Sequence, residues 1–334
     1  MNILMSILGF ALGLLAVGLL ASALFTLYCA RKVEALLPAQ GRFVDVPGAR
    51  LHVREFGQGF GEGRAILLVH GLGGQSSHFS YGLAALLAKR YRVVAVDRPG
   101  SGWSTRDGAA GADLSSQAAA LAALIERLAL GQPLVVGHSL GGAVALALAL
   151  EHPAKVAGLA LLAPLTHMRS DVPAVFKGLT IASPLLRKLV AWTLLVPRSI
   201  QSGRQTLEQV FGPEPVPRDF GTKGGGLLSL RPAAFLAASS DLQALPARLP
   251  LQQERYRELR VPVAVLYGKD DRILDWRANG RALADKVPGA RLDVIEGGHM
   301  LPVTQPAACA AFIEEVAQAA GLDDGAAASV AGAR

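Results

Sequence analysis

Apolar residues along the chain form short continuous runs, and longer segments of helical period separate these runs. The short runs predict buried strands at 65–69, 91–96, 133–136, 156–162, 261–267 and 291–295. The longer segments predict helices at 81–88, 113–130, 143–150, 276–286 and 305–319, and a hairpin is predicted at 42–56 around Pro47-Gly48. Apolar strands that alternate with helices are typical of a parallel sheet covered on both faces, so the pattern predicts an α/β fold.

This alternation is interrupted between residues 165 and 255. Residues 175–195 have the pattern of paired amphipathic helices, and 213–226 form a Pro- and Gly-rich loop. Ligands bind at the carboxyl ends of the strands in such sheets, so we expect 165–255 to form a helical cap over that edge. The predicted organisation is an N-terminal segment at 1–32, a core in two parts at 33–164 and 256–320, the cap between them, and a disordered Ala/Gly-rich tail at 321–334.

The N-terminal segment has no charged residue from Ile3 to Ala30, and nearly every position in this run is apolar. As a helix the run would be about 42 Å long, against roughly 30 Å of bilayer hydrocarbon. We expect a retained, single-pass transmembrane helix, which is also a candidate surface for pairing two copies into a homodimer. A cleaved signal peptide is the rival interpretation, with Ala21-Ser22-Ala23 as its cleavage site. Against it, the run exceeds the usual signal core of about 7–15 residues, and no basic residue precedes the run.

Charge bears on membrane orientation and on partners. Arg31 and Lys32 follow the apolar run, and the positive-inside rule would place the rest of the chain in the cytoplasm. The formal net charge is +7, and residues 165–260 hold 13 Lys/Arg and 7 Asp/Glu, so +6 of the excess lies there. A solvated surface explains such an excess, and a face toward anionic lipid headgroups is the second interpretation. No aromatic residues are interleaved with the basic ones, which argues against nucleic-acid binding.

Residues 137–141 read Gly-His-Ser-Leu-Gly and stand between a predicted strand and a predicted helix. A strand that turns sharply into a helix at a serine is a nucleophile elbow. The turn strains the serine backbone and lifts its hydroxyl clear of the sheet, and side chains at Gly137 or Gly141 would collide with neighbouring backbone. The sequence therefore predicts Ser139 as a catalytic nucleophile.

A serine nucleophile needs a base, and folds with such an elbow use the chain order Ser, Asp, His. His299 follows the last predicted strand and is preceded by two glycines, so a tight loop can carry its imidazole over the elbow. Asp270 and Asp271 lie in the only acidic loop after an earlier strand in the right place. We expect Asp271 to orient the imidazole and stabilise its charged form, and Asp270 to be a surface or turn residue.

The oxyanion of the tetrahedral intermediate needs two aimed backbone N–H groups. Leu140 is expected to supply one, and Leu72, in the Gly-rich loop 70–74, the other. His70 and His138 are expected to be structural. The histidines and the two cysteines form no metal-binding pattern, and the cysteines lie in distant elements. We therefore expect neither a metal, nor a cofactor, nor a structural disulfide.

With these motifs in view, the chain resembles the α/β-hydrolase superfamily over about residues 42–320. The resemblance rests on residues 70–74, 97–102, 137–142, 268–272 and 298–300. In that superfamily the second aspartate of the acidic loop is the usual acid, which falls on Asp271. A serine at the elbow argues against epoxide hydrolases and haloalkane dehalogenases, whose nucleophile there is an aspartate. The anchor and cap also look like those of bacterial membrane-anchored phospholipase A and lysophospholipase hydrolases and of anchored monoacylglycerol lipases.

This resemblance implies a bacterial inner-membrane protein whose soluble domain faces the periplasm. The flanking charges favour the cytoplasm instead, and we favour the periplasm on the resemblance. The predicted function is hydrolysis of carboxylic esters, and the tether, apolar cap and basic excess favour a lysophospholipid, phospholipid or monoacylglycerol. The alternatives are a C–C bond hydrolase or perhydrolase with the same triad, and a non-catalytic tethered binding protein on a hydrolase fold.

Overall fold

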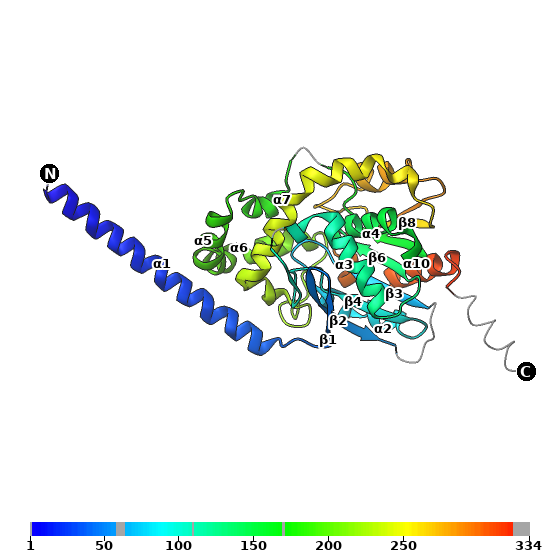
Figure 1. The fold of residues 1–334 in the computed structure, drawn as a ribbon, viewed down its shortest axis with the longest axis horizontal. Helices are drawn as coiled ribbons and strands as arrows, with labels where there is room; N and C mark the ends of the chain where they lie inside the picture. Colours follow the sequence, from blue (N-terminus) through cyan, green and yellow to red (C-terminus); the bar gives the residue numbers. More distant parts are fainter. Residues whose placement is uncertain (1, 58–63, 109, 169–170, 323–334) are drawn as a thin grey trace, which may run out of the picture.

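The computed structural model describes residues 2–57, 64–108, 110–168 and 171–322, and within these ranges nine strands form one sheet (Figure 1). The strand order is β1-β2-β4-β3-β6-β7-β8-β9, with β5 paired to β2. The strands are β1 (Arg42–Val46), β2 (Ala49–Phe56), β3 (Ala65–Val69), β4 (Arg92–Val96), β5 (Thr105–Arg106), β6 (Leu134–His138), β7 (Gly158–Leu162), β8 (Val263–Gly268) and β9 (Arg291–Ile295). All pairs from β4 to β9 are parallel, whereas the hairpin β1-β2 and the pair β2-β4 are antiparallel.

Alternate residues of the central strands pack on opposite faces of this sheet. Leu67 and Val69 of β3 belong to the core beneath α3 (Leu114–Arg127) and α4 (Leu140–Glu151). Ile66 and Leu68 belong to a second core with α2 (Leu83–Leu87) and α10 (Pro306–Ala319). This two-sided burial explains why the strands are apolar throughout, and it confirms the predicted α/β fold.

The cap consists of helices inserted between β7 and β8. They are η4 (Ala174–Leu179), α5 (Pro184–Thr193), α6 (Leu195–Phe211), η5 (Gly226–Leu230) and α7 (Pro232–Glu254), followed by η6 (Tyr256–Glu258). Helix α7 was not among the expected elements, because it contains Pro246 and Pro250, which usually end helices. The shorter turns of the core are η1 (Ser76–Tyr81), η2 (Ala110–Ala112), η3 (Pro153–Lys155) and α9 (Leu301–Thr304).

The predicted helix at 276–286 is a broken element instead. A π-turn, η7 (Arg277–Arg281), is followed by the short α8 (Ala282–Ala284). The Asn279 side chain is buried here, and its Oδ1 accepts a hydrogen bond of 3.0 Å from the Thr166 backbone. The wider π-turn directs the Asn279 side chain toward Thr166, in the segment that enters the cap.

Helix α1 (Asn2–Leu36) projects from the body over most of its length and meets the cap near its carboxyl end (Figure 1). Its buried residues are Thr26, Ala30 and Val33, and it packs on α5, α6 and η5. An ion pair of 3.0 Å joins Glu34 to Arg231, which immediately precedes α7. The helix is long and apolar enough to cross a membrane. At the other terminus, the expected tail 323–334 lies outside the described residues, and Leu322 is buried in the core.

Candidate active site

Ser139 lies between β6 and α4, with a φ of 54° and a ψ of −120°. This conformation is unfavourable for a residue with a side chain, and it turns the chain from strand to helix in one step. Close packing surrounds the turn, because a Cβ added to Gly141 would collide with the Val69 carbonyl oxygen. The local fold is therefore the elbow that the pentapeptide predicts.

His299 follows β9, and its Nδ1 lies 2.7 Å from Oδ2 of Asp271. The other carboxylate oxygen of Asp271 accepts backbone hydrogen bonds of 2.8 Å from Ile273 and 2.9 Å from Leu274. A carboxylate can only accept, so the His299 proton sits on Nδ1 and leaves Nε2 free to take another. Asp270, by contrast, is exposed at the adjacent position.

The backbone around His299 is fixed from two sides. The His138 ring donates a hydrogen bond of 3.0 Å to the His299 carbonyl, which places the imidazole loop beside the residue preceding Ser139. Glu214, from the cap, accepts a hydrogen bond of 3.0 Å from the Gly298 backbone. In the described part of the chain, the Ser139 hydroxyl makes no hydrogen bond to His299. Such contacts are often long in unliganded sites and shorten with substrate.

The two amides expected to stabilise an oxyanion lie on either side of the serine. Leu140 is the first residue of α4, and Leu72 belongs to the loop after β3. A Cβ added to Gly71 would lie only 2.8 Å from the Ser139 Cβ, so the loop passes directly against the serine. Within the described residues, neither the Leu72 nor the Leu140 amide has a hydrogen-bond partner, so both are available to a ligand.

Arg98, which follows β4, binds the Gly-rich loop 70–74 through two backbone carbonyls. Its Nε donates a hydrogen bond of 2.9 Å to the His70 carbonyl, and its Nη2 donates one of 3.0 Å to the Gly71 carbonyl. Its Nη1 is 2.8 Å from Asp241 on cap helix α7, and Asp241 also pairs with Arg106 at 2.5 Å. Arg98 and Asp241 are fully buried, so one carboxylate holds two cations where the cap meets the core.

The buried histidines of the site are neutral. Burial, with the nearby Arg98 charge, lowers the pKa of His70 from 6.5 to about 3, and burial lowers the pKa of His138 well below its usual value. The His70 ring accepts from the Arg98 backbone at 2.9 Å and donates to the Gly71 carbonyl at 2.8 Å. Among the described residues, no three His, Cys, Asp or Glu side chains are grouped so as to hold a metal ion.

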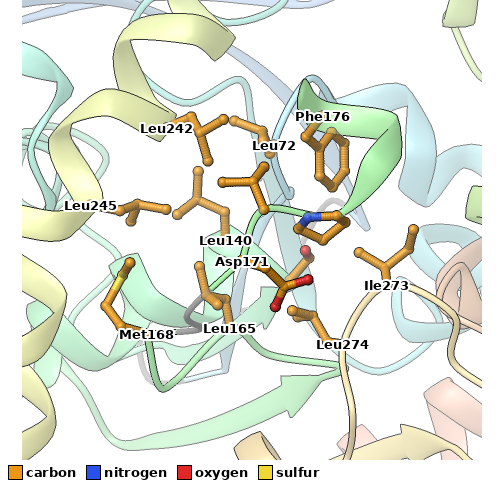
Figure 2. Close-up of a pocket in the computed structure, with 13 residues that line it drawn as sticks. Leu72, Leu140, Leu165, Met168, Asp171, Phe176, Leu242, Leu245, Ile273 and Leu274 are labelled. Atoms are coloured by element: carbon orange, nitrogen blue, oxygen red, sulfur yellow. The ribbon is translucent and has the colours of Figure 1, made fainter. Parts of the chain in front are cut away.

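Ser139 lines a pocket beneath the cap. Figure 2 shows Leu242 and Leu245 of cap helix α7 on one side of this pocket. Among the described residues of its lining, all but Ser139 and Asp171 are apolar. The lining residues are Leu72, Leu140, Leu165, Met168, Val172, Pro173, Phe176, Leu242, Leu245, Ile273 and Leu274. The pocket therefore suits an apolar chain whose reactive group reaches the elbow.

The sequence did not identify Arg98, Asp241 or Glu214 as contributors to this site. Arg98 belongs to one of the motifs that carry the resemblance. Its hydrogen bonds to the Gly-rich loop depend on the pairing of β3 with β4, which the sequence alone does not show. Asp241 gave no local signal, because it belongs to no motif and lies in an unexpected helix.

Comparison with known proteins agrees with this architecture. The family model described as alpha/beta hydrolase fold matches residues 64–306. A 2-hydroxy-6-oxononadienedioate/2-hydroxy-6-oxononatrienedioate hydrolase from Pseudomonas putida is 29% identical over 261 residues, which cover 75% of this chain and 85% of the relative.

Two solved structures are also similar. A membrane phospholipase A, described as a bacterial virulence factor, is 25% identical with a TM-score of 0.66, and the match covers 95% of this chain and 99% of that one. The enol-lactonase of Burkholderia xenovorans LB400 is 22% identical with a TM-score of 0.68, and covers 83% of this chain and 100% of that one. The chain therefore belongs to the alpha/beta hydrolase family and is a hydrolytic enzyme.

Proposed function

We propose that the enzyme hydrolyses carboxylic esters through Ser139, His299 and Asp271. Ser139 Oγ attacks the ester carbonyl carbon while Nε2 of His299 takes the hydroxyl proton. The Leu72 and Leu140 amides stabilise the oxyanion, and its collapse breaks the C–O bond as His299 returns the proton to the leaving alcohol. Water then repeats the sequence to release the acid. The hydrogen bond of 2.7 Å between Asp271 and His299, beside the strained serine, is the main support.

We further propose that the substrate is a lipid acyl ester: a lysophospholipid, phospholipid or monoacylglycerol. The pocket lining supports an acyl chain, because the described residues that form it are mostly apolar. Helix α1 supports access to membrane lipid, since its exposed apolar residues would be unfavourable in water. Residues 1–32 are then the anchor and 165–255 the cap.

The test is fatty-acid release from lipid vesicles by the detergent-purified, reconstituted full chain and by Ser139→Ala. Release by the wild type alone would support the proposal. Turnover confined to short, water-soluble esters would reject the lipid substrate, and equal turnover by Ser139→Ala would reject the nucleophile. Labelling of Ser139 by a fluorophosphonate probe separates an enzyme from a tethered binding protein.

A C–C bond hydrolase is the second candidate, because the Pseudomonas putida relative carries such a name. The substrate in that name is a dioate, and its carboxylates would need cationic partners. The described residues of the pocket lining are mostly apolar, which favours an ester with an acyl chain. A panel of esters and dienoic diacids would decide between the two.

We propose a periplasmic catalytic domain, as the resemblance implies. Burial raises the pKa of the Cys309 thiol to about 12, so this cysteine is protected from thiol reagents. Lys89→Cys, at an exposed position, in a Cys29→Ser background then gives a single reporter. Labelling of intact cells by an impermeant maleimide is expected, and labelling only after lysis would place the domain in the cytoplasm.

A further inference from the structure

The bare part of α1 has the length of a bilayer core. From Ile3 to Ala21, almost every side chain is exposed, and packing against the cap begins near Ser22. These residues span roughly 28 Å as a helix, against about 30 Å of hydrocarbon. If this part crosses the bilayer, the cap elements that touch Ser22 lie at the membrane surface.

The element at that level is α5. The Ser22 hydroxyl donates a hydrogen bond to the Thr193 carbonyl, at the carboxyl end of α5, and α1 packs along this helix. Helix α5 is held in one orientation, because Arg187 is buried and its Nη1 donates a hydrogen bond of 2.8 Å to the Ser240 hydroxyl.

The outward side of α5 is unusually apolar for a protein surface. Leu185 is 79% exposed and Trp192 is 41% exposed. We call the following residues the apolar cap face: Leu185, Leu186, Leu189, Trp192, Leu194 and Ile200. Exposed Lys188 and Arg198 lie among them in the sequence, where they can meet lipid phosphates. This combination of apolar and basic residues is that of a helix lying in a membrane interface.

We propose that the apolar cap face lies in the headgroup and upper acyl region of the same bilayer that α1 crosses. The proposal rests on the proposed anchoring and extends it from a tether to a second contact. Continuity with α1 favours lipid over a partner protein, because the anchor holds this face at the membrane surface. The contact also gives lipid a short route inward, because η4, whose Phe176 lines the pocket, leads into α5.

Trp192 provides the direct test. Trp103→Phe and Trp276→Phe leave it as the single tryptophan of the full chain. The protein is reconstituted in vesicles of phosphatidylethanolamine and phosphatidylglycerol, in which the acyl chains are brominated either near the ester groups or near the midplane. We expect strong quenching of Trp192 fluorescence by the shallow bromines and weaker quenching by the deep ones. No quenching in protein that floats with the vesicles would overturn the proposal.

A kinetic test uses Leu185→Ser combined with Leu189→Ser. Because both leucines would lose burial in lipid, fatty-acid release from vesicles should fall about tenfold or more, while hydrolysis of a short soluble ester is retained. Leu251→Ser is the matched control, since Leu251 is 64% exposed on α7 but lies outside this face. Equal rates for the double variant and the control on vesicles would contradict the proposal.

Flotation, quenching and fatty-acid release together distinguish failure of the anchor, of the lipid substrate and of the cap contact. Protein that does not float with vesicles would reject the anchor and this contact together. Flotation with quenching but no fatty-acid release would reject only the lipid substrate. Flotation and release without quenching would reject only the cap contact.

Discussion

Arg98 in the core and Asp241 in the cap form an ion pair of 2.8 Å from which solvent is excluded. Because Arg98 also binds the carbonyls of the Gly-rich loop, the pair connects the cap helix that lines the pocket with the amide proposed for the oxyanion. Arg106 binds the second oxygen of the same carboxylate at 2.5 Å. Arg98 therefore links the cap to the Gly-rich loop 70–74.

We predict that Asp241→Asn destabilises the protein by about 3–5 kcal/mol, because two buried guanidinium groups lose their shared counter-charge. Urea denaturation of the solubilised full chain measures the change. Glu126→Gln is the control, since it breaks a solvent-exposed pair with Lys155 and should change the free energy of unfolding far less. Similar losses for the two variants would contradict the prediction.

We predict that Arg98→Lys lowers kcat on a soluble ester by roughly tenfold to a hundredfold, because an ammonium cannot bind both loop carbonyls and Asp241 at once. KM should change little, since Arg98 is absent from the pocket lining. A change in KM alone would show that Arg98 acts on binding. The urea midpoint, measured in parallel, identifies a variant that has simply unfolded.

The adjacent aspartates provide a matched pair of variants. Asp271→Asn should reduce kcat by about 10⁴-fold, because an amide favours the wrong tautomer of His299. Asp270→Asn should leave kcat nearly unchanged, because that side chain is exposed. Comparable effects of the two substitutions on ester turnover would refute the choice of Asp271.

Stability should decrease in acid through His70. Its pKa is about 3 in the folded protein, mainly because of burial, against 6.5 in an unfolded chain. The stabilisation is therefore complete above about pH 6.5 and is lost as pH falls toward 3, because only the unfolded state binds the proton. Urea midpoints across this range should fall, and His70→Gln should make the fall shallower. An unchanged slope in the variant would contradict this assignment.

Local signals predicted most of the sheet. The strand at 291–295 coincides with β9, and Asp113 caps α3 by accepting a hydrogen bond from the Ser116 backbone at 3.1 Å. These elements were predictable because burial on both faces and side-chain capping leave a direct trace in the sequence.

The elements that depend on distant partners were not predictable. The turn at Asn279 accepts a hydrogen bond from the Thr166 backbone, 113 residues away in the sequence. Helix α7 forms although it contains two prolines. The site follows the same division. The motifs suggested Ser139, Asp271 and His299 as catalytic candidates, whereas Arg98, Asp241 and Glu214 gain their roles only through contacts across the fold.

Helix α1 packs on the cap, and the chain then runs through residues 37–41 to the first strand. In an anchored enzyme the cap would thus be fixed at the bilayer. The core sheet would be connected to the anchor through the short segment 37–41. Any separation of the core from this fixed cap would have to break the buried pair of Arg98 and Asp241. A version lacking the helix would lose that fixed point.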